Sequence, residues 1–161
     1  MIGDQIASGR VQIAVIGGGR CSARVAGLAE QVGAEIGRRG ATLVCGGLSG
    51  VMEAAARGAR SAGGLTVGVL PSYDRRSGNG WLDVFIPTGF GHGRNVIVVA
   101  SGDAVIALPG ESGTASEIAL ALTLGRCVVA LEGWTDSVGV VQAHSPPEAV
   151  DIALAAASAA E

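Results

Sequence analysis

Six short apolar runs recur along the chain, and most of them lead through a glycine-rich or polar turn into a segment that favours helix. These runs are Val11–Ile16, Ala41–Cys45, Leu65–Leu70, Leu82–Ile86, Ala104–Leu108 and Cys127–Leu131. Nearly continuous apolar strands are typical of a parallel sheet that helices cover on both faces. Alternation of such strands with helices is the pattern of a doubly wound fold. We therefore predict a single α/β domain, Rossmann-like with a doubly wound parallel sheet, over residues 11–161, after a loose N-terminal tail of residues 1–10.

End signals place helices between or after these strands. Serine and threonine favour the position before the first helical turn, and glycine favours the position after the last. On this basis helices are expected from a cap at Ser22 to about Arg39, from a cap at Ser49 to Gly63-Gly64, around Arg94–Ala100, from Thr114 to about Leu124, and from near Pro147 to about Ala160. The stretch Glu132–Ser145 shows no clear period, and we expect a variable connection there.

The turns that follow the strands are the candidate site. Right-handed crossovers bring the carboxyl ends of parallel strands to one edge of the sheet, where ligands of such folds bind. Three of these turns are rich in glycine, and the exposed N–H groups of a helix start attract anions. We therefore expect a phosphorylated small molecule to bind at this edge, to Gly17, Gly18, Gly19, Ser22, Gly46, Gly47, Gly110, Ser112, Gly113 and Thr114.

The segment Pro109–Glu117 allows two interpretations. As a tight turn between a buried strand and a helix, it offers unpaired N–H groups to an anion. The spacing Thr114-x-x-Glu117 also fits a capping box, in which the threonine caps the helix and the glutamate bonds back to its start. The two are compatible, because Thr114 can order the turn while Gly110, Ser112 and Gly113 offer their N–H groups.

Composition excludes several chemistries. The 161 residues include no lysine, which excludes Schiff-base catalysis and a P-loop lysine. A net charge of −3 and 3% aromatic residues argue against nucleic acid as a partner. The three cysteines form no CxxC or Cys/His cluster, so no metal site is indicated. A dinucleotide is disfavoured, because Gly17-x-Gly19-x-x-Ser22 lacks the third glycine and no acidic residue ends the second strand.

The pattern also bears on location and assembly. The apolar runs are too short for a membrane span and the N-terminus is polar, so we expect a cytoplasmic protein without a membrane partner. Charged residues make up only 16% of the chain and the helices are rich in alanine. An apolar helix face is therefore expected to support self-association, as a homodimer or homotetramer.

Three motifs occur in an order that resembles the Lonely-Guy (LOG) superfamily, members of which were long mislabelled as lysine decarboxylases. They are Gly46-Gly47-x-x-Gly50-Val51-Met52, Gly91-His92-Gly93-Arg94-Asn95 and Pro109-Gly110-x-x-Gly113-Thr114-x-x-Glu117. The span from about Val11 to Ala157 is similar to the short single-domain branch that includes the molybdenum-cofactor carrier proteins. Without a lysine for pyridoxal phosphate, a lysine decarboxylase is excluded.

The resemblance implies a Rossmann-like protein whose ligand is the molybdenum cofactor or a nucleoside monophosphate. The enzymes of the superfamily hydrolyse the N-glycosidic bond of nucleoside 5′-monophosphates, and their catalytic arginine and glutamate match Arg94 and Glu117. Two positions depart from the enzymes' pattern: Glu111 replaces a glycine beside the phosphate turn, and Asn95 replaces a lysine. The carboxylate of Glu111 would repel an anion bound at this turn unless the side chain points away from it.

We therefore expect a protein that binds a phosphorylated nucleotide-like or pterin-like ligand, similar to molybdenum-cofactor carrier proteins. Two alternatives stay open. One is a nucleoside 5′-monophosphate phosphoribohydrolase with Arg94 and Glu117 as catalytic residues. The other is a nucleotide-sensing module that acts through a protein partner, since folds of this kind host unrelated functions.

Overall fold

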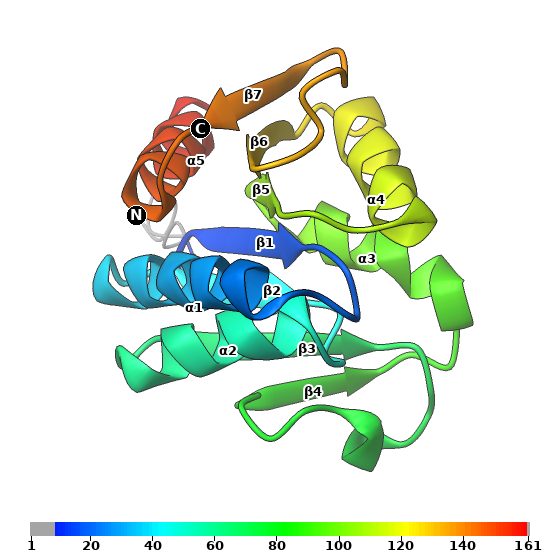
Figure 1. Ribbon diagram of the computed structural model, residues 1–161. Helices are drawn as coiled ribbons and strands as arrows, with labels where there is room; N and C mark the ends of the chain where they lie inside the picture. Colours follow the sequence, from blue (N-terminus) through cyan, green and yellow to red (C-terminus); the bar gives the residue numbers. More distant parts are fainter. Residues whose placement is uncertain (1–8, 161) are drawn as a thin grey trace, which may run out of the picture.

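A seven-stranded parallel sheet lies between two layers of helices in the computed structural model, which describes residues 9–160 (Figure 1). Neighbouring strands follow the order β4-β3-β2-β1-β5-β6-β7, and every pair is parallel. The strands are β1 (Gln12–Ile16), β2 (Thr42–Cys45), β3 (Leu65–Leu70), β4 (Val84–Pro87), β5 (Ala104–Ala107), β6 (Cys127–Leu131) and β7 (Val140–Ala143). The doubly wound parallel sheet predicted from the strand–helix alternation is confirmed.

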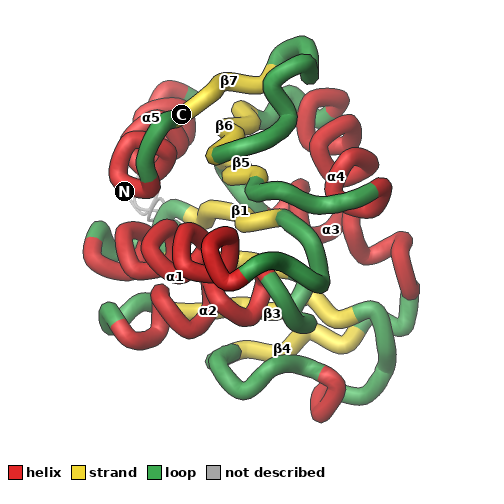
Figure 2. The backbone as a smooth tube through the Cα atoms, in the orientation of Figure 1, coloured by secondary structure: helices red, strands yellow, loops and turns green. Residues whose placement is uncertain are grey.

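The helices divide unequally between the two faces of the sheet, as Figures 1 and 2 show. One face carries α1 (Ala23–Arg38), α2 (Val51–Ser61) and α5 (Pro146–Ala159), and the other carries α3 (Arg94–Ser101) and α4 (Ser112–Thr123). Side chains alternate along each strand. Ile13 and Val15 therefore pack under α1, α2 and α5, while Ala14 and Ile16 pack under α3 and α4. This alternation explains why the central strands are apolar at successive positions.

Helices α1 and α2 touch backbone to backbone through glycines. A Cβ atom on Gly33 would lie 1.9 Å from the carbonyl oxygen of Ala55, and one on Gly58 would lie 1.9 Å from the carbonyl oxygen of Glu30. No larger residue fits at these separations. The turns before the two helices are joined as well, because the N–H of Val51 donates to the carbonyl of Gly18 at 3.0 Å.

Some predicted boundaries are wrong. The expected variable connection Glu132–Ser145 contains β7, which pairs with β6. The fourth strand is Val84–Pro87 instead of Leu82–Ile86. Ser49 does not cap α2, because its hydroxyl donates to the Gly19 carbonyl at 2.8 Å and Gly50, at φ 68°, precedes the helix.

Other predicted ends agree closely with the structure. Ser22 caps α1, accepting from the N–H of Val25 at 3.2 Å. Helix α5 starts one residue before Pro147, with Ser145 as its cap. Of the predicted tail, residues 1–8 lie outside the described residues. In the part of the chain that is described, no helix is long and apolar enough to cross a membrane.

Candidate functional site

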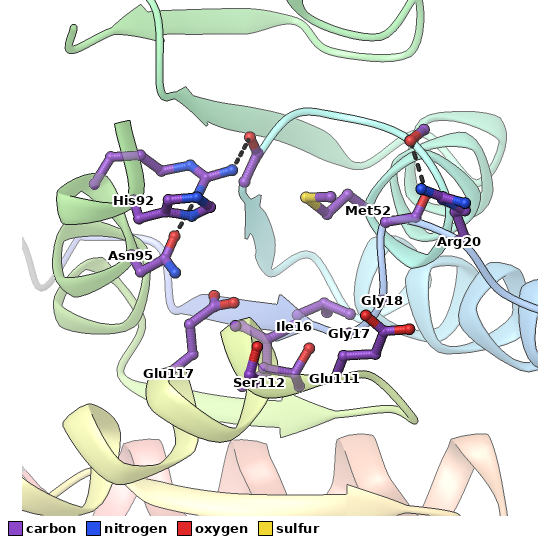
Figure 3. A pocket seen from close by; sticks show the side chains of 17 residues that line it. Ile16, Gly17, Gly18, Arg20, Met52, His92, Asn95, Glu111, Ser112 and Glu117 are labelled. Atoms are coloured by element: carbon purple, nitrogen blue, oxygen red, sulfur yellow. Dashed lines mark hydrogen bonds between the residues drawn. The ribbon is translucent and has the colours of Figure 1, made fainter. Parts of the chain in front are cut away.

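A cavity of about 610 Å³ opens at the carboxyl edge of the sheet, between the turns that follow β1, β2 and β5 and the first turns of α3 and α4 (Figure 3). Nine of the predicted site residues line it: Gly17, Gly18, Gly19, Gly46, Arg94, Ser112, Gly113, Thr114 and Glu117. Eight further lining residues were not predicted as site residues: Val15, Ile16, Arg20, Ser49, Met52, His92, Asn95 and Glu111. All eight stand beside or within the glycine-rich turns and motifs, and Asn95 and Glu111 were also noted as departures from the pattern of the LOG enzymes.

Three predicted residues do not line the cavity but shape its walls. Ser22 is occupied as the cap of α1. Gly47 has a positive φ of 77°, and a Cβ atom there would lie 2.5 Å from Leu70. Gly110 lies under the side chain of Thr114, whose Oγ1 would be 2.1 Å from a Cβ at position 110. These residues allow close packing of the turns instead of facing a ligand.

The capping box predicted at Thr114-x-x-Glu117 is wrong. Helix α4 begins at Ser112, so that Thr114 lies inside its first turn, where it is 4% exposed against Gly110. The first carbonyl to receive a bond from the helix is that of Glu111, which accepts from the N–H of Ala115 at 3.0 Å. Tertiary packing of the threonine against glycine therefore overrides the local capping signal.

Three backbone N–H groups at the start of α4 are unpaired. Within the described residues, the N–H groups of Ser112, Gly113 and Thr114 have no hydrogen-bond acceptor, and these residues line the cavity. The positive end of the helix dipole lies at the same place. This wall of the cavity can therefore receive a phosphate or carboxylate.

The turns after β1 and β5 pack directly on each other. The N–H of Gly18 donates to the carbonyl of Pro109 at 3.0 Å. A Cβ atom on Gly18 would lie 3.5 Å from the Cα of Gly110. Two segments some 90 residues apart in sequence are thus joined at the floor of the cavity, next to the unpaired N–H groups.

Arg94 is a buried arginine held by main-chain oxygens. It is 7% exposed, and its Nε donates to the carbonyl of Val69 at 2.9 Å while Nη2 donates to the carbonyl of Gly46 at 3.3 Å. Its Nη1 donates to Oδ1 of Asn95. Burial lowers the pKa of Arg94, and the nearby Glu117 opposes that effect. The guanidinium therefore ties the ends of β2 and β3 to α3.

Asn95 turns its amide nitrogen away from Arg94, because its oxygen is the atom that accepts from the guanidinium. The side chain is 5% exposed and lines the cavity, and Figure 3 shows it on the same side of the cavity as the carboxyl group of Glu117. Where the LOG enzymes place a lysine, this chain thus presents a neutral NH₂ donor.

Glu117 is the acid of the cavity. It is half-buried in the second turn of α4, and burial raises its pKa from 4.5 to about 7, although the positive charge of Arg94 lowers it. The two side chains form no ion pair within 4.0 Å among the described residues. At neutral pH the carboxyl group is thus shared between its acid and its carboxylate, and it can donate or accept a hydrogen bond.

The rim of the cavity carries exposed polar and charged side chains. Glu111 is the residue before α4, and its side chain makes no capping bond to the unpaired N–H groups beside it. Arg20 and His92 stand on the turns after β1 and before α3. In residues 9–160, no group of three or more His, Cys, Asp or Glu side chains could hold a metal ion.

Comparison with known proteins adds a family and several relatives. The sequence profile of the SLOG cluster4 family matches residues 10–159. The solved structure of the molybdenum cofactor binding protein from Rippkaea orientalis is 36% identical with a TM-score of 0.87, covering 91% of this chain and 96% of that one. The molybdenum cofactor carrier protein from Chlamydomonas reinhardtii is 30% identical with a TM-score of 0.84, covering 92% and 99%.

A catalytic relative also matches. The cytokinin riboside 5′-monophosphate phosphoribohydrolase of Mycobacterium tuberculosis is 37% identical over 123 residues, which are 74% of this chain. The match spans 58% of the length of that enzyme. Similarity to the two molybdenum-cofactor proteins therefore covers nearly the whole of both chains. Similarity to the enzyme covers about three quarters of this chain and little more than half of the enzyme.

Proposed function

This chain belongs to the SLOG cluster4 family, in agreement with its motifs, and on that premise we propose that it binds a phosphorylated nucleotide-like or pterin-like ligand in the cavity at the carboxyl edge of the sheet. The observation that carries the proposal is the set of unpaired N–H groups of Ser112, Gly113 and Thr114, three residues that line that cavity. In this proposal these N–H groups donate to the phosphate, and the positive end of the helix dipole adds to the attraction.

The rest of the cavity suits a polar heterocycle or a ribose. Asn95 supplies an NH₂ donor, and Glu117 supplies a group that donates or accepts. A volume of about 610 Å³ lies within the usual range of small-molecule sites. The relatives that bind or carry the molybdenum cofactor support a pterin-like cargo. In such a cargo the phosphate and the ring, instead of the metal, are the parts these residues recognise.

Proline at Ser112 tests the phosphate contact. Ser112 is the first residue of α4, where proline is tolerated, and Glu111 before it is extended as proline requires. Ser112→Pro removes one N–H group, whereas Ser112→Ala removes only the hydroxyl. Since a hydrogen bond to a charged group contributes about 1.5–3 kcal/mol, we expect Ser112→Pro to weaken binding of AMP by at least about 10-fold and Ser112→Ala by less than about twofold.

Isothermal titration with AMP and with molybdopterin measures these affinities, and native mass spectrometry of freshly purified protein reports any ligand that it retains. Wild-type protein that binds neither compound, shows no rise in melting temperature with either and retains no phosphorylated molecule would refute the proposal.

Hydrolysis of a nucleoside 5′-monophosphate is a second candidate, favoured by Glu117. With a pKa of about 7, Glu117 is partly ionised at neutral pH, and its carboxylate can stabilise oxocarbenium charge or orient water, close to the positive charge of Arg94. The test is release of adenine from AMP, followed by chromatography. Turnover that Glu117→Gln abolishes supports an enzyme, and absence of free base with saturating AMP excludes this candidate.

We also propose that a second copy of the chain covers helices α3 and α4. Their solvent-facing residues are uncharged, among them Val96, Ala100, Ala115 and Ala119, whereas α1 and α2 carry the ion-paired residues Glu30, Glu35, Arg38 and Arg57. The neighbouring edge strand exposes Val84 and Ile86 by 41% and 43%. Two identical uncharged faces match each other in a twofold dimer.

A charge placed on each face tests this assembly. Ala119→Arg is expected to convert the dimer to a monomer in light scattering. Gln31→Arg, which adds the same charge to an exposed position of α1, should leave the mass unchanged. A wild-type protein that is monomeric at working concentration would contradict the proposed dimer.

A further inference from the structure

Three consecutive residues after β6 adopt left-handed backbone conformations. Glu132, Gly133 and Trp134 have φ values of 58°, 76° and 59°. For the two non-glycine residues this conformation costs roughly 1–2 kcal/mol each. Such a backbone persists only where contacts with its surroundings compensate for the cost.

The compensating contacts are directed at the turn between β5 and α4. The indole Nε1 of Trp134 donates to the carbonyl of Leu108 at 3.0 Å. A Cβ atom on Gly133 would lie 3.8 Å from Cγ of Pro109. At the start of the segment, Glu132 forms an ion pair with Arg24 of α1. The segment Glu132–Trp134 is therefore a brace on the far side of this turn.

The brace itself is anchored within the loop and in β7. The carbonyl of Trp134 accepts from the N–H of Ser137 at 3.1 Å and from Nε2 of Gln142 at 3.2 Å. The ring of Trp134 is half-buried and packs against the apolar cluster under α3 and α4. The position of the indole is thus fixed both by the hydrogen bonds to the Trp134 carbonyl and by the packing of the ring.

Three carbonyls of the turn have hydrogen-bond partners. That of Leu108 accepts from Trp134, that of Pro109 accepts from the N–H of Gly18, and that of Glu111 accepts from the N–H of Ala115. The carbonyl of Leu108 lies outside the hydrogen-bond ladder of the sheet, and its partner is a side chain. These partners hold the backbone that leads into the start of α4, whose first three residues line the cavity.

We propose that Trp134 is a positioning residue for the anion-binding turn. Its indole N–H fixes the peptide unit between Leu108 and Pro109, and thereby the direction of the N–H groups of Ser112, Gly113 and Thr114. The ligand readout of this inference rests on the proposed function of the cavity, whereas the geometry of the turn does not. If Trp134 only filled space, its N–H could be removed without effect on the turn.

Phenylalanine at position 134 removes the N–H and keeps an aromatic ring. Trp81 is the other tryptophan of the chain; it is half-buried against the opposite apolar cluster, and Trp81→Phe is therefore a matched control. Amide NMR resonances of Ser112, Gly113 and Thr114 are expected to shift in Trp134→Phe and to stay in place in Trp81→Phe. This measurement needs no ligand.

Affinity provides the second readout. With AMP as the probe, and at a temperature at which both variants are folded, we expect Trp134→Phe to weaken binding about 5-fold or more, the effect of one hydrogen bond. Trp81→Phe should change it by less than about twofold, even where both lower the melting temperature. Unchanged amide resonances in Trp134→Phe, or equal losses of affinity in both variants, would overturn the inference.

Two further outcomes are separable. If wild-type protein binds neither AMP nor molybdopterin, shows no rise in melting temperature with either and retains no phosphorylated molecule, but the amide shifts occur, the proposed function fails and the positioning role stands. If Trp134→Phe does not fold, a benzothiophene analogue of tryptophan, introduced in the Trp81→Phe background, removes only the N–H. The same amide shifts are then expected, and their absence counts against the inference.

Discussion

Neutralising Glu117 is expected to remove a large part of the pH dependence of stability. Burial raises the pKa of this glutamate from 4.5 to about 7, so that the folded protein binds its proton more tightly than the unfolded chain does. The stability that this proton confers is complete below pH 4.5 and is lost as pH rises through about 7. Glu117→Gln keeps the size of the side chain and removes its titration.

The size of the effect follows from the pKa. Each pKa unit is worth about 1.4 kcal/mol, so a pKa that rises from 4.5 to about 7 corresponds to about 3 kcal/mol. Most of this falls between pH 5 and pH 8. In a domain of this size, 1 kcal/mol changes the melting temperature by about 2–4 °C. Relative to wild type, Glu117→Gln should therefore gain about 6–12 °C when pH is raised from 5 to 8.

Melting curves followed by circular dichroism at pH 5, 6, 7 and 8, without ligand, measure this difference. Glu53→Gln removes a carboxylate outside the cavity, and there we expect the wild-type pH profile to persist. The reasoning is refuted if wild type and Glu117→Gln lose stability in parallel between pH 5 and pH 8. A gain of the opposite sign would mean that the positive charge of Arg94 outweighs burial.

Three further predictions concern the walls of the cavity and the layer behind them. Glu111→Gly removes an exposed negative charge beside the phosphate contact, and calorimetry should find that AMP binds about 5–10-fold more tightly at low salt. At about 0.5 M salt the gain in affinity should be smaller, because exposed charges are screened. Gly33→Ala places a Cβ atom 1.9 Å from the carbonyl oxygen of Ala55 and should lower the free energy of unfolding, measured in urea, by at least about 2 kcal/mol. Gly27→Ala, in the same helix but with open space around it, should be neutral or stabilising. Arg94→Lys loses hydrogen bonds to two main-chain carbonyls and should cost about 2 kcal/mol of stability without ligand, a result that a melting curve unchanged from wild type would contradict.

The sheet could be predicted because its signal is local. In β1, β2 and β5 nearly every side chain is buried, so their sequences are apolar whichever face a residue occupies. Strand β7 lies at an edge, with Val141 42% exposed, and its four residues stand in a stretch of glycine, serine and aspartate. An edge strand of that kind lacks the continuous apolar run by which the others were recognised.

The turns of the site were predictable, but their internal partners were not. Glycine spacing and parallel topology indicated which segments meet. The start of α4 depends on the contact of Thr114 with Gly110, and the charge state of Glu117 depends on burial. Arg94 is held by the carbonyls of Val69, in β3, and of Gly46, just after β2. Every residue has a main-chain carbonyl oxygen, so the sequence does not indicate which of these oxygens will be a partner, and only the folded structure does.

The glycine contacts between α1 and α2 give the two walls of the cavity different mechanical properties. Gly33 and Gly58 each pack against a carbonyl of the opposite helix, and the carbonyl of Gly18 accepts from the N–H of Val51, so the turns after β1 and β2 are joined both directly and through their helices. The opposite wall consists of α3, only eight residues long, and α4, with a brace behind it. Adjustment to the shape of a ligand therefore falls mainly to α3, which has no such brace among the described residues and is one of the two helices that we propose a second copy covers. Occupancy of the cavity and the strength of that assembly are then thermodynamically linked.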